Sequence, residues 1–206
     1  MINNCWDIFP LEHIENLKKT SRNMLIHKGD IVFQQEDSFK GFYLVNFGRL
    51  KVYSLSYQGK ESIINIAEQN HLIGVPLFLG NILTYPLSLE ALDYSSLFFF
   101  EKSSVINLIQ KVPVIQNILM ALSLNCLFLL MKKTISLMQD SLNERLLKYL
   151  SELGARDKFI KLSINKNQIA HLLNASPEAI SRSFRFLKEN NLIIEKDECY
   201  KITYNP

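Results

Sequence analysis

The distribution of apolar and polar residues separates a strand-rich stretch from helical stretches on either side. Between residues 24 and 100, short runs of β-branched and aromatic residues alternate with turn residues, as in an all-β domain. Such a set of strands closes as a barrel, roll or sandwich. The predicted strands are residues 30–34, 41–46, 49–57, 62–67, 87–92 and 96–100.

Helical spacing of apolar residues precedes and follows this stretch. Residues 4–22 fit one apolar helix face, and residues 101–111 predict a short helix. Pro113 opens a longer helix that we expect to reach about residue 138. Its segment 118–131 is apolar nearly all round, which predicts burial on several sides. A membrane span needs about 20 apolar residues and this segment has 14, so we expect no membrane partner. Three scattered cysteines and the lack of a signal-peptide pattern lead us to expect a cytoplasmic protein.

Residues 165–187 predict two short helices joined by a tight turn. Asn165 and Gln168 have capping-box spacing at the start of the first helix. Asn174 suits a left-handed turn position. Ser176 then caps the second helix, and Pro177 occupies its first position. The stretch is therefore interpreted as a helix-turn-helix.

The second of these helices has an apolar side and a polar side. The predicted buried residues are Ile180, Phe184 and Leu187, and the predicted outward row is Glu178, Ser181, Arg182, Arg185 and Lys188. Helix-turn-helix proteins read bases with such a row, because Arg pairs with guanine, Glu accepts from cytosine and Ser reaches either edge. The alternative is a solvated face with a Glu178–Arg182 ion pair, which would contribute roughly 0.3–0.5 kcal/mol.

The remainder of the C-terminal part predicts a helix, a strand and a hairpin. Ser141 and Glu144 form a second capping box, and that helix should end at Gly154. Residues 158–164 predict a strand, and residues 192–203 predict a hairpin beside the helix-turn-helix, in the position of a wing.

The net positive charge lies in the same part of the chain as the predicted helix-turn-helix, which favours that part as a nucleic-acid interface. Residues 1–140 hold 12 Lys and Arg and 12 Asp and Glu, whereas residues 141–206 hold 11 and 8, so the whole net charge of +3 lies in the C-terminal part. Phosphates bind to such surfaces. We find no P-loop, no nucleophile motif and no paired carboxylates, so we predict that the protein is not an enzyme. Cys5, Cys126 and Cys199 are scattered and form no C-x-x-C, so we expect no metal site.

Glycine-punctuated motifs in the strand-rich part carry a family resemblance. They are H-K-G-D-I-V-F-Q-Q-E-D from residue 27, G-F-Y-L-V-N-F-G-R-L-K-V from residue 41, G-K-E from residue 59 and L-I-G from residue 72. Together with the helix-turn-helix, the chain resembles the cyclic-AMP receptor protein/fumarate–nitrate regulator (CRP/FNR) family of bacterial transcription factors. The resemblance implies an α+β fold with an N-terminal β-roll (cupin-like jelly roll), a long dimerisation α-helix and a C-terminal winged helix-turn-helix.

The resemblance also locates an effector pocket in the roll. Family members that bind cyclic nucleotides use a Gly-Glu pair and an Arg-Ser pair, and here the matching positions hold Gly74 with Val75, and Tyr85 with Pro86. Without the Arg, no bidentate cation meets a phosphate, so we expect no cyclic nucleotide. The lining, which includes Phe78, could accept a haem or another flat apolar ligand, or be filled by its own side chains.

These inferences combine into one predicted organisation. Residues 1–110 form a β-roll sensor domain, 111–138 a dimerisation helix and 139–206 a DNA-binding domain. By resemblance, the protein is a homodimer that binds palindromic double-stranded DNA with T-T-G-A-like half-sites and works with RNA polymerase. Glu178, Ser181 and Arg182 would meet bases, and Ser176, Arg185, Lys188 and Lys166 would support them or hold phosphates. The alternative is a regulatory or partner-binding module that does not bind DNA.

Overall fold

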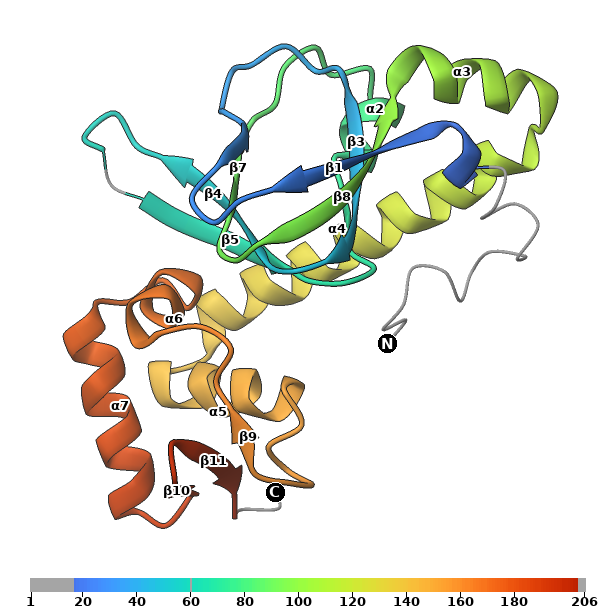
Figure 1. The fold of residues 1–206 in the computed structure, drawn as a ribbon. Coiled ribbons are helices and arrows are strands. Elements are labelled where there is room, and N and C mark those ends of the chain that lie inside the picture. Colours follow the sequence, from blue (N-terminus) through green and yellow to red (C-terminus); the bar gives the residue numbers. More distant parts are fainter. Residues whose placement is uncertain (1–16, 60, 204–206) are drawn as a thin grey trace. The chain divides into compact units, whose positions relative to one another are not determined.

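The computed structural model describes residues 17–59 and 61–203, and it divides into two compact units (Figure 1). The first unit is Met1–Leu129 and the second is Leu130–Pro206. The boundary falls inside the long helix α4 (Val114–Gln139). Each unit is described by itself.

The first unit is built on two four-stranded antiparallel sheets, which Figure 1 shows facing each other as a roll. One sheet has the order β1-β8-β3-β6 and the other the order β2-β7-β4-β5. Alternation of β-branched and aromatic residues with polar ones lets each strand bury one face. The strands are β1 (Ser21–Ile26), β2 (Ile31–Phe33), β3 (Gly41–Phe47), β4 (Leu50–Leu55), β5 (Glu61–Ala67), β6 (Leu72–Ile73), β7 (Ser88–Ala91) and β8 (Ser95–Glu101).

Aromatic rings fill much of the interior of the roll. The rings of Phe42 and Phe100 stack with centroids 4.9 Å apart, and both side chains are fully buried. Tyr85 stacks on Phe33 at 3.9 Å, and Phe33 in turn lies 5.6 Å from Tyr43. Large rings bury much apolar area each and gain further from offset stacking. The core of this unit is therefore made of ring-to-ring contacts from both sheets.

Three helices belong wholly or partly to the first unit. They are α2 (Val75–Leu79), α3 (Lys102–Lys111) and α4. Only the first turns of α4 are buried, at Ile115, Ile118, Leu119 and Leu122. Beyond them, large apolar side chains such as Phe128, which is 60% exposed, face solvent. Within one chain, the roll therefore covers one side of this helix, and burial of its other side stays a prediction.

The second unit is a winged helix-turn-helix. Its elements are α5 (Leu142–Glu152), β9 (Ile160–Lys161), α6 (Lys166–Leu172), α7 (Pro177–Glu189), β10 (Ile193–Lys196) and β11 (Cys199–Ile202). The three strands form a small antiparallel sheet in the order β10-β11-β9. The hairpin turns at Asp197 and Glu198, which both have positive φ (50° and 60°). Such a turn has the primed geometry whose twist matches that of the flanking strands.

The predicted α+β fold, with roll, long helix and winged helix-turn-helix, is confirmed. Our helix prediction for residues 4–22 falls mostly outside the described residues, and its end is wrong because Ser21 and Arg22 begin β1 and pair with β8. The predicted strand 158–164 shortens to Ile160–Lys161, the only residues in it that reach β11. The three-part domain division stays a prediction.

Candidate nucleic-acid interface

Side-chain caps fix both helices of the helix-turn-helix. Asn165 accepts from the backbone N–H of Gln168 at 2.9 Å, and the Gln168 side chain accepts from the backbone N–H of Asn165 at 3.1 Å. Between the helices, Asn174 adopts a left-handed conformation with φ 50°. The Ser176 hydroxyl accepts from the backbone N–H of Ala179 at 3.2 Å, and Pro177 occupies the first turn of α7. These caps satisfy helix-end N–H groups that would otherwise have no partner in the helix.

The inner side of α7 holds the helix against its neighbours. Ile180 and Leu187 are fully buried and Phe184 is 2% exposed. The Phe184 ring packs 5.1 Å from the ring of Tyr200 in β11. The buried Ser183 hydroxyl donates to the Asn143 side-chain oxygen in α5 at 2.6 Å. Apolar packing therefore sets the depth of α7, and one buried polar contact sets its register against α5.

The outer side of α7 carries the predicted base-reading row. Glu178, Ser181 and Arg182 are all exposed. The Ser181 hydroxyl donates to the carbonyl of Pro177 at 3.0 Å. Hydrogen bonds from the Glu178 backbone N–H and from Ser176 hold the pKa of the Glu178 carboxyl below its usual value, so this acceptor is ionised at neutral pH.

The predicted phosphate contacts differ in what surrounds them. Arg185 is exposed and makes no ion pair within the described part of the chain. The Lys166 ammonium lies 5.2 Å from the centre of the Phe184 ring, a cation–π arrangement that places it beside α7. Lys188 is paired: its Nζ lies 2.6 Å from Oε2 of Glu195 in β10. The structure thus brings Lys188 to the wing.

The residues predicted for an effector pocket meet in the core of the roll. Gly74 has φ 92° and precedes α2, which carries the buried Val75 and Phe78. Tyr85 is 2% exposed, and its hydroxyl donates to the carbonyl of Gly41 at 2.7 Å. Burial raises the pKa of this hydroxyl, so it stays neutral. The candidate lining is therefore committed to internal packing and to one hydrogen bond with the backbone.

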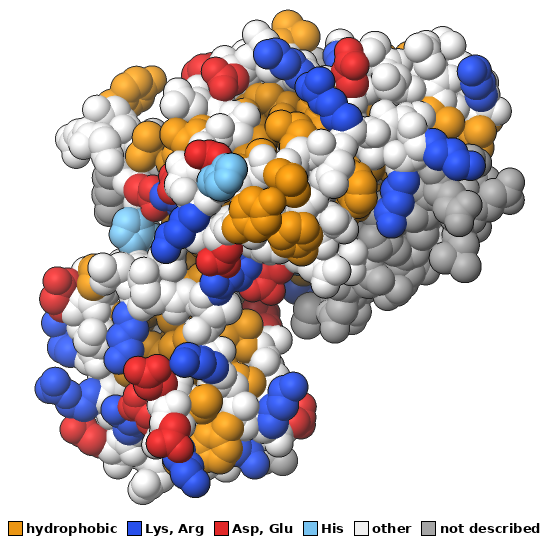
Figure 2. Space-filling view, in the orientation of Figure 1, with side chains coloured by type: hydrophobic (Ala, Val, Ile, Leu, Met, Phe, Trp, Pro, Cys, Tyr) orange, Lys and Arg blue, Asp and Glu red, His pale blue; other side chains and the backbone are white. Residues whose placement is uncertain are grey.

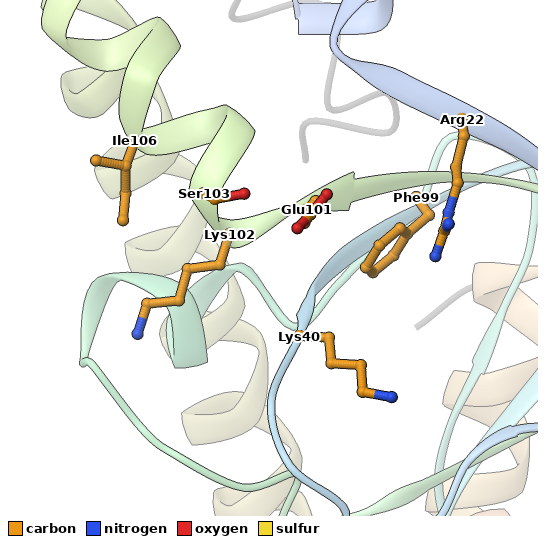
Figure 3. A pocket seen from close by; sticks show the side chains of 7 residues that line it. All are labelled: Arg22, Lys40, Phe99, Glu101, Lys102, Ser103 and Ile106. Carbon is orange, nitrogen blue, oxygen red and sulfur yellow. The ribbon is translucent and has the colours of Figure 1, made fainter.

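A cleft of about 490 Å³ lies on the outside of the roll, where β1 and β8 meet α3 (Figure 3). It is lined by Arg22, Lys40, Phe99, Glu101, Lys102, Ser103 and Ile106. The Arg22 guanidinium stacks 4.9 Å from the centre of the Phe99 ring, and Lys102 donates to Asn81 at 2.9 Å. The sequence pattern did not indicate this cleft, because Arg22 falls at the end of the predicted helix 4–22 and lies instead in β1. Its lining mixes three cations with one carboxylate and defines no single ligand chemistry.

Cysteine and histidine side chains lie apart from one another in the described residues. Within residues 17–59 and 61–203, no three His, Cys, Asp or Glu side chains gather as a metal site requires. Cys126 lies on α4, where burial raises the pKa of its thiol, and Cys199 lies in the wing. Cys5 is outside the described residues. Two separate thiols do not provide the four ligands of an iron–sulfur cluster.

Comparison with known proteins agrees with both units. Residues 24–112 match the model of the cyclic nucleotide-binding domain, and residues 144–204 match that of the Crp-like helix-turn-helix domain. A β-roll sensor module and a winged helix-turn-helix in one chain define a DNA-binding transcription regulator. The chain belongs to the CRP/FNR family, whose members are regulators and not enzymes.

Relatives of known name cover most of the chain. The transcriptional activator protein Anr of Pseudomonas protegens is 28% identical over 89% of this chain and 78% of its own length. The probable transcriptional regulator flp of Lacticaseibacillus casei is 26% identical over 94% and 91%.

Solved structures show the same fold at lower identity. The regulator CLP of Xanthomonas campestris has a TM-score of 0.79 at 15% identity, with 95% of this chain and 100% of that chain covered. FixK2 of Bradyrhizobium japonicum has a TM-score of 0.78 at 17% identity, with 89% and 93% covered.

The Ser183–Asn143 contact gives a stability prediction. Ser183→Ala should lower the free energy of local unfolding of α7 by about 0.5–1.5 kcal/mol, because the part-buried Asn143 oxygen loses its partner. Ser181→Ala on the same helix should change it by less than about 0.5 kcal/mol, since that hydroxyl is exposed. Hydrogen exchange of the α7 amides measures both. Equal effects of the two substitutions would show that the buried contact does not hold α7.

Proposed function

We propose that this regulator is a homodimer that reads a palindromic DNA site with the N-terminal half of α7. The observation that carries the proposal is the exposed Glu178, Ser181 and Arg182 row on a helix whose opposite side is buried. In helix-turn-helix proteins this part of the second helix faces base edges in the major groove. The relatives' names describe transcription regulators, which supports RNA polymerase as a further partner.

The residue chemistry supports a T-T-G-A-like half-site. Arg182 can donate two hydrogen bonds to a guanine, Glu178 can accept from the amino group of a cytosine, and Ser181 can contact a thymine edge. Ser176 at the helix N-terminus, with Arg185 and Lys166 beside it, would hold phosphates. Such contacts fix register without reading sequence.

The exposed side of α4 supports the homodimer. Five large apolar residues recur at alternating intervals of four and three: Leu124, Phe128, Met131, Ile135 and Met138. All five side chains are exposed, from 49% to 80%. This spacing is that of a and d positions in a coiled coil, where the occupant is a second helix of the same kind. We call these five residues the α4 seam.

A membrane is the other environment that such a helix could enter. Helix α4 has 26 residues, a mean hydropathy of 2.0 in its most apolar window and only 22% of that window buried, so its length and composition suffice for a span. The apolar segment 118–131 that we counted in the sequence is shorter than the apolar part of this helix. Because the family consists of soluble regulators, we assign the seam to a second copy and the protein to the cytoplasm.

The signal received by the roll is proposed not to be a cyclic nucleotide. Val75 and Tyr85 supply no cation at the positions where the family binds the cyclic phosphate, and both are buried among apolar groups. An unpaired phosphate charge there would be costly to bury. A haem or another flat ligand would have to displace the stacked Phe33 and Tyr85 rings.

Isothermal titration calorimetry tests whether the roll binds a cyclic nucleotide. Cyclic AMP and cyclic GMP should give no saturable heat with the full chain. Cyclic di-GMP is the third ligand to titrate, because the regulator CLP of Xanthomonas campestris is responsive to it. Micromolar binding of cyclic AMP or cyclic GMP would contradict the proposal and would call for a different cation near Gly74.

The α4 seam gives an oligomerisation prediction. Phe128→Asp should shift the protein from dimer to monomer in sedimentation experiments, because a carboxylate would be buried opposite its own copy. Gln116→Asp, an exposed polar position on the same helix away from the seam, should leave the dimer intact. A monomeric unsubstituted protein, or a dimeric Phe128→Asp variant, would contradict the seam.

Base reading by Arg182 is tested by fluorescence anisotropy with a palindromic T-T-G-A duplex. Arg182→Ala should weaken binding by about 1–3 kcal/mol and remove the preference for the G·C pair. Arg185→Ala should instead weaken binding to all DNA sequences alike. It should also reduce the salt slope, which is the steepness with which the logarithm of the binding constant falls with the logarithm of the salt concentration, by about 1. Unchanged affinity of Arg182→Ala would refute its role. No salt-sensitive binding to any duplex would favour a module that binds a protein partner.

A further inference from the structure

The last turn of the recognition helix is tied to the wing through one carboxylate. Oε2 of Glu195 lies 2.6 Å from the Lys188 ammonium. Oε1 of the same carboxylate accepts from the Tyr200 hydroxyl at 2.8 Å. Tyr200 is 4% exposed, and its ring packs against Phe184 on the inner side of α7. Both carboxylate oxygens are therefore engaged, one by α7 and one by β11.

This arrangement fixes the charge state of the pair. The hydrogen bond from Lys188, followed by that from Tyr200, holds the pKa of the Glu195 carboxyl below its usual value. Glu195 is therefore ionised at neutral pH, and the pair carries no net charge. The two side chains are 43% and 30% exposed, so the pair sits at the surface, within reach of solvent and of a bound polyanion.

Lys188 differs in this respect from its neighbour on α7. Arg185 is exposed one turn earlier and makes no ion pair within the described residues. In Figure 2, acidic side chains are interspersed with the basic ones over the C-terminal unit. The number of Lys and Arg residues in this unit therefore overstates the number of cations that are available to phosphates. Glu198 makes a similar but looser pair with Lys161, at 3.5 Å and with both side chains mostly exposed.

We propose that Glu195 is a positioning residue that takes the place of a DNA phosphate at Lys188. The proposal rests on the proposed function and changes one part of it: Lys188, predicted from sequence as a phosphate contact, stays with Glu195 when DNA binds. A DNA phosphate would have to compete with a carboxylate that Tyr200 already holds in place. Because each neutralised phosphate contributes about 0.9 to the salt slope, the Lys188–Glu195 pair contributes nothing to it.

The consequence is that the protein binds DNA of any sequence more weakly than it would with a free Lys188. Phosphate contacts strengthen binding to every duplex equally, so removing one weakens operator and random DNA alike. Glu195 thus keeps the recognition helix dependent on its base contacts without touching a base.

The test compares Glu195→Gln with the unsubstituted chain by anisotropy on operator and on random duplex between 50 and 200 mM salt. Glutamine keeps the shape and a hydrogen-bond acceptor but releases Lys188. Glu195→Gln should steepen the salt slope by about 0.9 and tighten binding to both duplexes about five-fold near 0.15 M salt. Tyr200→Phe is the matched control: it removes the second hydrogen bond and no charge, so its slope should stay unchanged.

A double variant separates this proposal from the sequence-based one. The double variant Lys188→Gln with Glu195→Gln should have the salt slope of the unsubstituted chain. The ion pair that it removes contributes nothing to the slope, and neither do the two glutamines that replace it. If Lys188 contacts phosphate in the unsubstituted protein, the double variant should lose about 0.9 of slope and Glu195→Gln alone should not change it. That result would overturn the proposal and leave DNA binding intact, whereas no DNA binding by the unsubstituted chain would overturn both.

Discussion

The packing of α7 against the rest of its unit is the constraint on which the DNA-binding unit depends. Ile180, Phe184 and Leu187 are buried almost completely, so the helix can present only its other face to solvent. The Ser183–Asn143 hydrogen bond adds direction to this apolar packing, which by itself would tolerate sliding. The residues that α7 buries therefore decide which of its residues face solvent.

The roll depends on a different kind of packing. Its interior is closed by rings that contact one another, with Tyr85 stacked on Phe33 and hydrogen-bonded to the Gly41 carbonyl. A ligand of the size of a nucleotide would need these rings to move, and interiors packed at this density do not deform gradually. The fold matches the cyclic nucleotide-binding domain, and under our proposal its interior takes no cyclic nucleotide, which would separate fold from function in this unit.

Features encoded locally were predictable from sequence, and features made by distant segments were not. The two capping boxes, the Asn174 turn and the Ser176 cap each depend on residues within four positions of one another, and all are present. Strand β1 was missed because only its pairing with β8 makes it a strand. The side of α4 that the roll covers could not be predicted, because the helix is apolar nearly all round.

The same distinction applies to the candidate site. The outward position of Glu178, Ser181 and Arg182 follows from helical periodicity alone. The pairing of Lys188 with Glu195 does not, because the two residues meet only once the hairpin folds back on α7. The cleft around Arg22 and Lys40 likewise joins residues of β1, β8 and α3 whose proximity no local pattern encodes.

Under our proposal, the α4 seam makes the protein's own concentration a thermodynamic variable. A chain that buries apolar surface only when paired is stabilised by its second copy, so its melting temperature rises with its concentration. Because a palindromic site needs two recognition helices, occupancy then rises more steeply than linearly with the amount of monomer. The helix that completes the fold would therefore also convert a modest change in synthesis rate into a larger change in promoter occupancy.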